Sequence, residues 1–144
     1  MEAEPEHERR FAIMLIEHGD FDEAERVLSE ALKAGEPVAQ LLVIDARLRS
    51  GRIDAARELL LSVDRERITA RLRYPYAVTC ALVAVACEDQ KLKDLATAYL
   101  HELPSAGSRI ASEVNKLLKA LNDREQADPE GIMTRLRHVF TGRT

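Results

Sequence analysis

Apolar side chains recur along most of the chain at intervals of three and four residues, the spacing of one face of an α-helix. Within residues 6–18 this stripe holds Phe11, Met14 and Leu15 and ends at His18, and Ile13 and Ile16 widen it. Later stripes with the same period are Phe21, Ala24, Val27, Leu28, Ala31 and Leu32; Leu41, Leu42, Ile44 and Leu48; Ile53, Ala56, Leu60 and Val63; and Leu92, Leu95, Ala96, Tyr99 and Leu103. No segment of useful length alternates with period two. The pattern therefore predicts an all-α fold of about seven or eight helices without a β-sheet.

Glycines mark the turns between the first helices. Gly19 and Gly51 each follow an apolar stripe, and they predict sharp turns because glycine adopts a positive φ without steric cost. Asp20 precedes Glu23 by three residues, the spacing of a capping box, so we expect its side chain to cap the second helix. Both turns are very short, and helices joined in this way pack antiparallel.

The middle of the chain is less regular between residues 64 and 75. Ile68 and Leu72 are four residues apart, which permits a short helix that Pro75 then interrupts or restarts. Residues 75–87 are apolar on every side, which is typical of a helix buried among its neighbours.

Two further helices are expected after Pro104, which stops the preceding one. The first starts at Ser108 and has the pattern of a capping helix, with Ile110, Val114, Leu117, Leu118 and Leu121 facing inward. A polar connector follows. Asp128 and Pro129 then give the sequence of a helix start, and the last helix carries the apolar stripe Ile132, Leu136, Val139 and Phe140. We divide the chain into an acidic tail (1–5), a helical repeat domain with its capping helix (6–122), and a connector with a C-terminal amphipathic helix (123–144).

One decapeptide occurs twice. "GDFDEAERVL" begins at Gly19, and "GRIDAARELL" begins 32 residues later at Gly51. With Ala31 and Pro37, the first copy resembles the tetratricopeptide repeat, whose period is about 34 residues. A third, degenerate copy has apolar residues at Leu92, Leu95 and Tyr99, with Gln90 in the place of the glycine.

The resemblance covers residues 5–103 and implies antiparallel helical hairpins stacked as a short right-handed solenoid. The aromatic residue that the family carries in its first helix is missing. The alternative is an unrelated helical bundle that contains a chance repeat.

The net charge of the chain argues against two classes of binding function. A net charge of −4 argues against a general nucleic-acid binder or a binder of anionic membranes. The acidic N-terminus shows no secretory signal, and the longest apolar run, Ala77–Cys87, is too short to span a bilayer. We therefore expect a cytoplasmic protein.

Motifs of catalysis and metal binding are not found. The sequence holds no phosphate-binding glycine loop, no HExxH and no CxxC, and its four histidines are scattered. His18, near Glu17 and Asp20, could in principle bind a metal, but we interpret it as a residue at a helix end, where the dipole favours a cation. Cys80 and Cys87 would lie roughly 10 Å apart on one helix, too far for a disulfide, and we interpret them as small buried hydrophobes. We predict no enzyme activity, no cofactor and no metal.

The resemblance also implies a concave groove made by the first helix of each hairpin. In this sequence the groove positions are Arg9, Ile13, Ile16, Glu17, Leu41, Asp45, Leu48, Arg49, Cys80, Ala84 and Cys87. Family members that clamp a C-terminal carboxylate use Lys and Asn at places where this chain has Arg9 and Ile13, so that clamp looks absent. A mostly apolar groove suits a peptide or an amphipathic helix from a partner protein.

Three functions stay open. The first is a non-catalytic adaptor or scaffold that binds another protein in the groove. The second is a dedicated export-type chaperone that holds a small aggregation-prone client. The third is a regulator that contacts nucleic acid through a basic patch of Arg65, Arg67, Arg71 and Arg73. The C-terminal helix either packs on its own chain or docks onto a partner or a second copy.

Overall fold

The computed structural model describes residues 5–103, 115, 116 and 119. Every element in this part of the chain is helical, and none of it forms a β-strand. The elements are α1 (Pro5–Glu17), α2 (Phe21–Val27), α3 (Ser29–Lys33), α4 (Pro37–Arg49), α5 (Ile53–Ser62), the 3₁₀ turns η1 (Arg65–Arg67) and η2 (Ala70–Leu72), α6 (Arg73–Cys87) and α7 (Gln90–Glu102). The all-α prediction is therefore confirmed. The expected helices over 108–121 and 129–140 lie outside the described residues, apart from 115, 116 and 119, which are helical.

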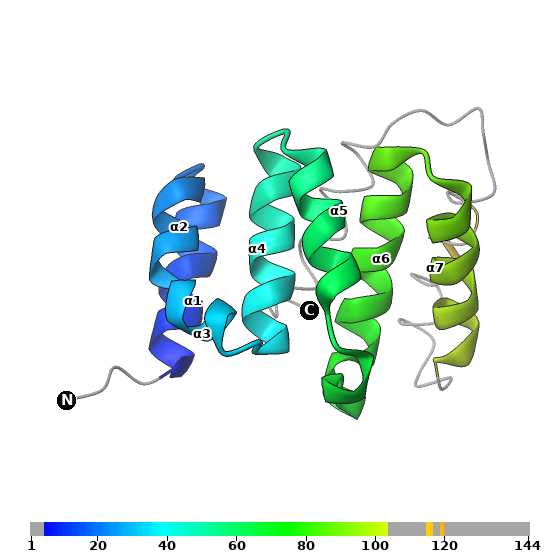
Figure 1. Ribbon diagram of the computed structural model, residues 1–144, viewed down its shortest axis with the longest axis horizontal. Helices are drawn as coiled ribbons and strands as arrows, with labels where there is room; N and C mark the ends of the chain where they lie inside the picture. The colour runs from blue at the N-terminus through cyan, green and yellow to red at the C-terminus, as the bar shows by residue number, and fades with distance from the viewer. Residues whose placement is uncertain (1–4, 104–114, 117–118, 120–144) are drawn as a thin grey trace. The chain divides into compact units, whose positions relative to one another are not determined.

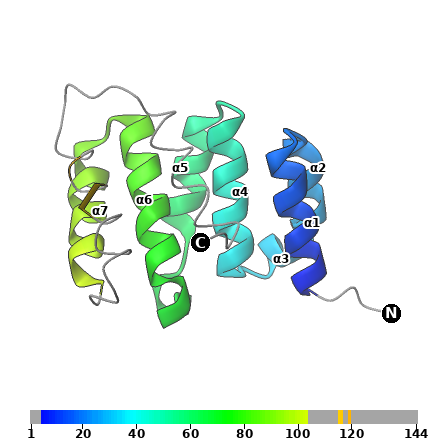
Figure 2. The ribbon, with the colours of Figure 1, turned by 180° about the vertical axis from the view of Figure 1, so that it is seen from behind.

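The chain divides into two compact units, residues 1–68 and 69–144. In the first unit, α1 pairs with α2 and α4 pairs with α5, and the two hairpins meet through contacts of α4 with α1, α2 and α3 (Figure 1). Figure 2 shows the side of this unit on which α1 lies in front of α2. In the second unit, α6 pairs with α7.

The turns that connect the two helices of each hairpin share one backbone geometry. In the first hairpin, Gly19 has φ of 85°, and its N–H donates to the Ile16 carbonyl oxygen at 3.1 Å. The next N–H, that of Asp20, donates to the Leu15 carbonyl oxygen at 2.8 Å. Gly51 repeats this arrangement with φ of 83°, which confirms the turns predicted at both glycines. The Asp20 side chain makes no capping hydrogen bond, so the predicted capping box is wrong.

The third hairpin uses the same turn without a glycine. Glu88 has φ of 54°, and its N–H donates to the Val85 carbonyl oxygen at 3.3 Å. The sequence alignment placed Gln90 at the glycine position, and the structure corrects this. Gln90 is the first residue of α7 and corresponds to Phe21 and Ile53, which begin α2 and α5.

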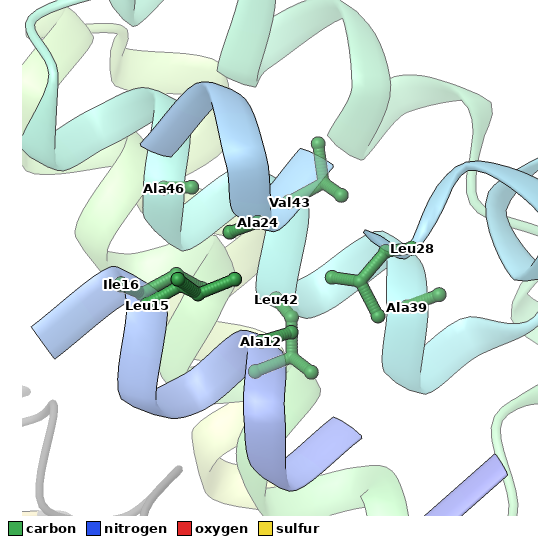
Figure 3. Close-up of a cluster of buried hydrophobic side chains, with 9 residues drawn as sticks. All are labelled: Ala12, Leu15, Ile16, Ala24, Leu28, Ala39, Leu42, Val43 and Ala46. Atoms are coloured by element: carbon green, nitrogen blue, oxygen red, sulfur yellow. The ribbon is translucent and has the colours of Figure 1, made fainter. Parts of the chain in front are cut away.

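The core of the first unit is built from small and branched side chains (Figure 3). It comprises Ala12, Leu15, Ile16, Ala24, Leu28, Ala39, Leu42, Val43 and Ala46. Ala12 and Ala24 are completely buried, and alanine at such positions lets neighbouring helix backbones approach closely. Ala56 of α5 is also completely buried, as its place in the repeat predicts.

Two inward stripes predicted from the sequence are partly wrong. On α1, Phe11 and Met14 are each 44% exposed, whereas Ala12 and Ile16 are buried. Positions 12, 15 and 16 also satisfy helical spacing, and the packing against α2 and α4 selects that face. On α7, Leu95 is 38% exposed.

Helix boundaries differ from the sequence prediction at two places. The single helix expected from Phe21 to Leu32 is interrupted at Leu28, whose φ of −88° and ψ of 1° separate α2 from α3. Pro75 does not begin a helix, because α6 starts at Arg73 and accommodates the proline in its first turn, where no intrahelical N–H donor is needed. The buried helix predicted over 75–87 is confirmed, since its residues from 76 to 84 are all buried.

Candidate partner-binding surface

The positions expected to line a groove differ widely in exposure. On α1, Arg9 and Ile13 are half-buried, Glu17 is exposed, and Ile16 lies in the core with 3% of its surface exposed. Within the first unit α1 contacts α4 directly, and Ile16 shares a buried cluster with Ala39, Leu42, Val43 and Ala46 of α4.

The α4 positions are much less accessible. Leu41 is 2% exposed, and Asp45 and Leu48 are each 4% exposed. Arg49 pairs with Asp45, its Nε lying 3.2 Å from Oδ2, and the Arg49 side chain is 11% exposed. The two charges compensate each other, as a pair removed from water requires. In this state, Leu41, Asp45 and Leu48 do not offer a surface to a partner.

The remaining groove positions lie on α6 in the second unit. Cys80 and Ala84 are buried and Cys87 is half-buried. No disulfide joins the two cysteines, in agreement with their spacing on one helix. These three positions therefore present little surface on the described part of the second unit.

The second unit also buries two tyrosines that the sequence did not mark as a pair. The ring centroids of Tyr76 and Tyr99 lie 5.5 Å apart with the planes tilted by 42°. Burial raises the pKa of the Tyr76 hydroxyl well above its usual value, and nearby Cys80 and Tyr99 reinforce the shift. The hydroxyl therefore stays protonated at neutral pH and acts in packing and hydrogen bonding.

The basic patch predicted between residues 65 and 73 is divided by the structure. Arg67 and Arg71 belong to separate 3₁₀ turns, so they do not share one helix face as their spacing suggested. The guanidinium of Arg67 is engaged within the first unit, where Nη1 donates to the carbonyl oxygens of Ala34 at 3.0 Å and Gly35 at 2.6 Å. All four arginines, Arg65, Arg67, Arg71 and Arg73, are exposed.

A polar cluster that sequence reasoning missed joins the first two hairpins. Glu25 of α2 accepts from Arg47 of α4, with Nε at 3.1 Å and Nη2 at 3.0 Å, and it also pairs with Arg52. Arg47 donates through Nη1 to the Ala55 carbonyl oxygen at 3.1 Å. We call Glu25, Arg47 and Arg52 the hairpin clamp. No local pattern identifies the clamp, because its members are brought together only by packing.

Among the described residues no group of three or more His, Cys, Asp or Glu side chains is arranged to hold a metal ion. Within the same part of the chain, no helix combines the length and the apolar character that crossing a membrane requires.

The antiparallel hairpins with a common turn define a helical-repeat protein. Residues 15–67, from the end of α1 through η1, match the family model described as tetratricopeptide repeat. This match supports the resemblance to the tetratricopeptide repeat over that part of the chain. Such repeats generally mediate protein–protein interactions and are typically non-catalytic. No significant match to a curated protein or to a solved structure was found.

Proposed function

We propose that the chain is a non-catalytic adaptor that binds another protein, and that α1 contributes the contact surface of the first unit. The match of residues 15–67 to the tetratricopeptide repeat supports the class of function. The accessibility of Arg9, Ile13 and Glu17 supports the location, because the neighbouring groove positions on α4 are buried. On α1, the half-buried apolar side chain of Ile13 lies between the cation Arg9 and the anion Glu17 in the sequence. We expect such a surface to bind a short amphipathic peptide segment.

The test compares two charge reversals during affinity capture from the native cells. Arg9→Glu and Glu17→Lys each reverse a charge on the proposed surface, and Glu58→Lys makes the same reversal as Glu17→Lys on the exposed side of α5. We expect a captured protein that is retained by wild type and by Glu58→Lys but lost by the two α1 variants. The dissociation constant of that purified protein should rise at least tenfold in Arg9→Glu. Equal binding by all four proteins would show that α1 is not the contact surface.

The same experiment separates the adaptor from a dedicated chaperone. An adaptor's partner is soluble when it is produced alone. A chaperone's client is recovered in a one-to-one complex and precipitates without it. Cytoplasmic location, inferred from the sequence alone, stays part of the proposal.

The C-terminal stripe of Ile132, Leu136, Val139 and Phe140 lies outside the described residues. Its role as a docking helix, in its own chain or in a second copy, remains a proposal based on its sequence. Truncation after Asp128 should lower the melting temperature if the segment packs on its own chain, and should change the oligomeric mass if it docks in trans. A truncated protein with the same melting temperature, mass and partner binding would contradict both roles.

A further inference from the structure

Arg67 binds a turn that precedes it by 32 residues. Its Nη1 donates to the carbonyl oxygens of Ala34 and Gly35, which follow the last residue of α3. Carbonyl groups at a helix end lack intrahelical donors, and a guanidinium supplies both a donor and a favourable charge there. Arg67 therefore anchors η1 to the turn between α3 and α4.

The turn is shaped to receive this side chain. Gly35 has φ of 71°, and a Cβ atom built on it would lie 2.7 Å from Arg67 Nη1. A Cβ built on Gly51, which has φ of 83°, meets no atom within 4 Å. Gly35 thus meets two requirements, a left-handed backbone and close approach of the guanidinium, whereas Gly51 meets only the first.

The anchor lies next to the boundary between the two units. The first unit ends at Ile68, and α6 of the second begins at Arg73. The connection from α5 to α6 covers residues 63–72. Arg67 fixes η1 to the first unit, and η2 contacts α6 of the second unit, so only Ile68 and Thr69 join the two turns. A connection of two residues has few backbone dihedral angles that can change, so the anchor shortens the effective linker.

We propose that Arg67 and Gly35 form a latch that restricts the movement of the second unit relative to the first. Arg67 is a positioning residue that acts through the linker and needs no contact with a partner. A partner that binds both units must fix their relative orientation, which costs entropy. A restricted linker lowers this cost, because the units have less orientational freedom before binding. The assignment holds whether or not α1 is the contact surface.

The latch can be opened from either side, and each side has a matched control. Arg67→Gln removes the charged donor, whereas Arg71→Gln makes the same change at an equally exposed arginine of η2. Gly35→Ala keeps Arg67 but displaces its guanidinium. Gly51→Ala introduces the same unfavourable positive φ without touching the latch.

The measurement is the distance distribution between two spin labels on the full chain, at Glu58→Cys in α5 and Lys91→Cys in α7. Both sites are exposed, Cys87 is replaced by serine, and Cys80 is buried. We expect Arg67→Gln and Gly35→Ala to broaden the distribution, and Arg71→Gln and Gly51→Ala to leave it unchanged. Amide exchange at residues 66–68 should rise on the order of tenfold in the two latch variants only.

Two results would overturn the proposal. In the first, the amides exchange faster but the distance distribution stays the same, so the contact stabilises η1 without restricting the units. In the second, Gly51→Ala broadens the distribution as much as Gly35→Ala does, so the effect follows from the strained glycine position and not from Arg67.

Discussion

Removing the charge of Glu25 should weaken the packing of the first hairpin against the second. In the hairpin clamp, the Glu25 side chain is 18% exposed and that of Arg47 is 22% exposed, so the pair is largely shielded from water. Glu25→Gln keeps the shape of the side chain but removes its charge. Arg47 would retain its bond to the Ala55 carbonyl oxygen and lose its carboxylate partner.

The expected loss follows from the burial of the pair. Exposed ion pairs contribute about 0–1 kcal/mol, and breaking a fully buried pair costs about 3–5 kcal/mol. The clamp lies between these limits, so Glu25→Gln should reduce the free energy of unfolding by about 2 kcal/mol. At this chain length, that loss lowers the melting temperature on the order of 4–10 °C.

Urea denaturation in a double-mutant cycle provides the assay. The coupling of Glu25 to Arg47 should exceed its coupling to Arg52, because the Arg52 side chain is 43% exposed and is screened by salt. Glu23→Gln is the control, since Glu23 pairs with Arg26 at the surface, where the side chains are 40% and 76% exposed. The reasoning is refuted if Glu25→Gln costs no more than Glu23→Gln.

The apolar pattern was sufficient to predict most helices and the turns at Gly19 and Gly51. These features depend on local spacing and on the one residue type that adopts positive φ freely. The glycine criterion does not predict the turn at Glu88, because a left-handed residue other than glycine leaves no mark in the sequence. The apolar spacing does not predict that Phe11 is exposed, because two faces of α1 satisfy helical spacing. Only the packing of α1 against α2 and α4 decides which face is buried.

The candidate site was less predictable than the fold, since accessibility depends on long-range packing. The repeat register assigned Leu41 and Leu48 to a groove, yet both are buried. Charge clustering suggested a basic patch that included Arg67, but the guanidinium is occupied by carbonyl groups from a turn distant in sequence. In each case the sequence gives the side chain its chemistry, and contacts between hairpins decide whether a partner can reach it.

Four further substitutions test the individual hairpins. Ala24→Leu and Ala56→Leu should each cost about 1–3 kcal/mol in urea denaturation, because both sites are fully buried, and unchanged stability in both would contradict the repeat register. Glu88→Gly should stabilise the chain by up to about 1 kcal/mol, since relief of the left-handed backbone outweighs the greater entropy of the unfolded glycine, and a loss of stability would contradict the strain at φ of 54°. The fourth substitution, Tyr76→Phe, concerns the pH dependence of stability. Burial holds the pKa of the folded Tyr76 hydroxyl above its unfolded value of about 10, so the unfolded chain releases this proton first as the pH rises. The contribution to stability is therefore complete below pH 10 and is lost above it by up to about 1.4 kcal/mol per pH unit. Tyr76→Phe cannot lose it, so the free energy of unfolding of wild type should fall more steeply than that of the variant between pH 10 and 11. Parallel curves would show that the buried hydroxyl ionises as easily in the folded chain as in the unfolded one.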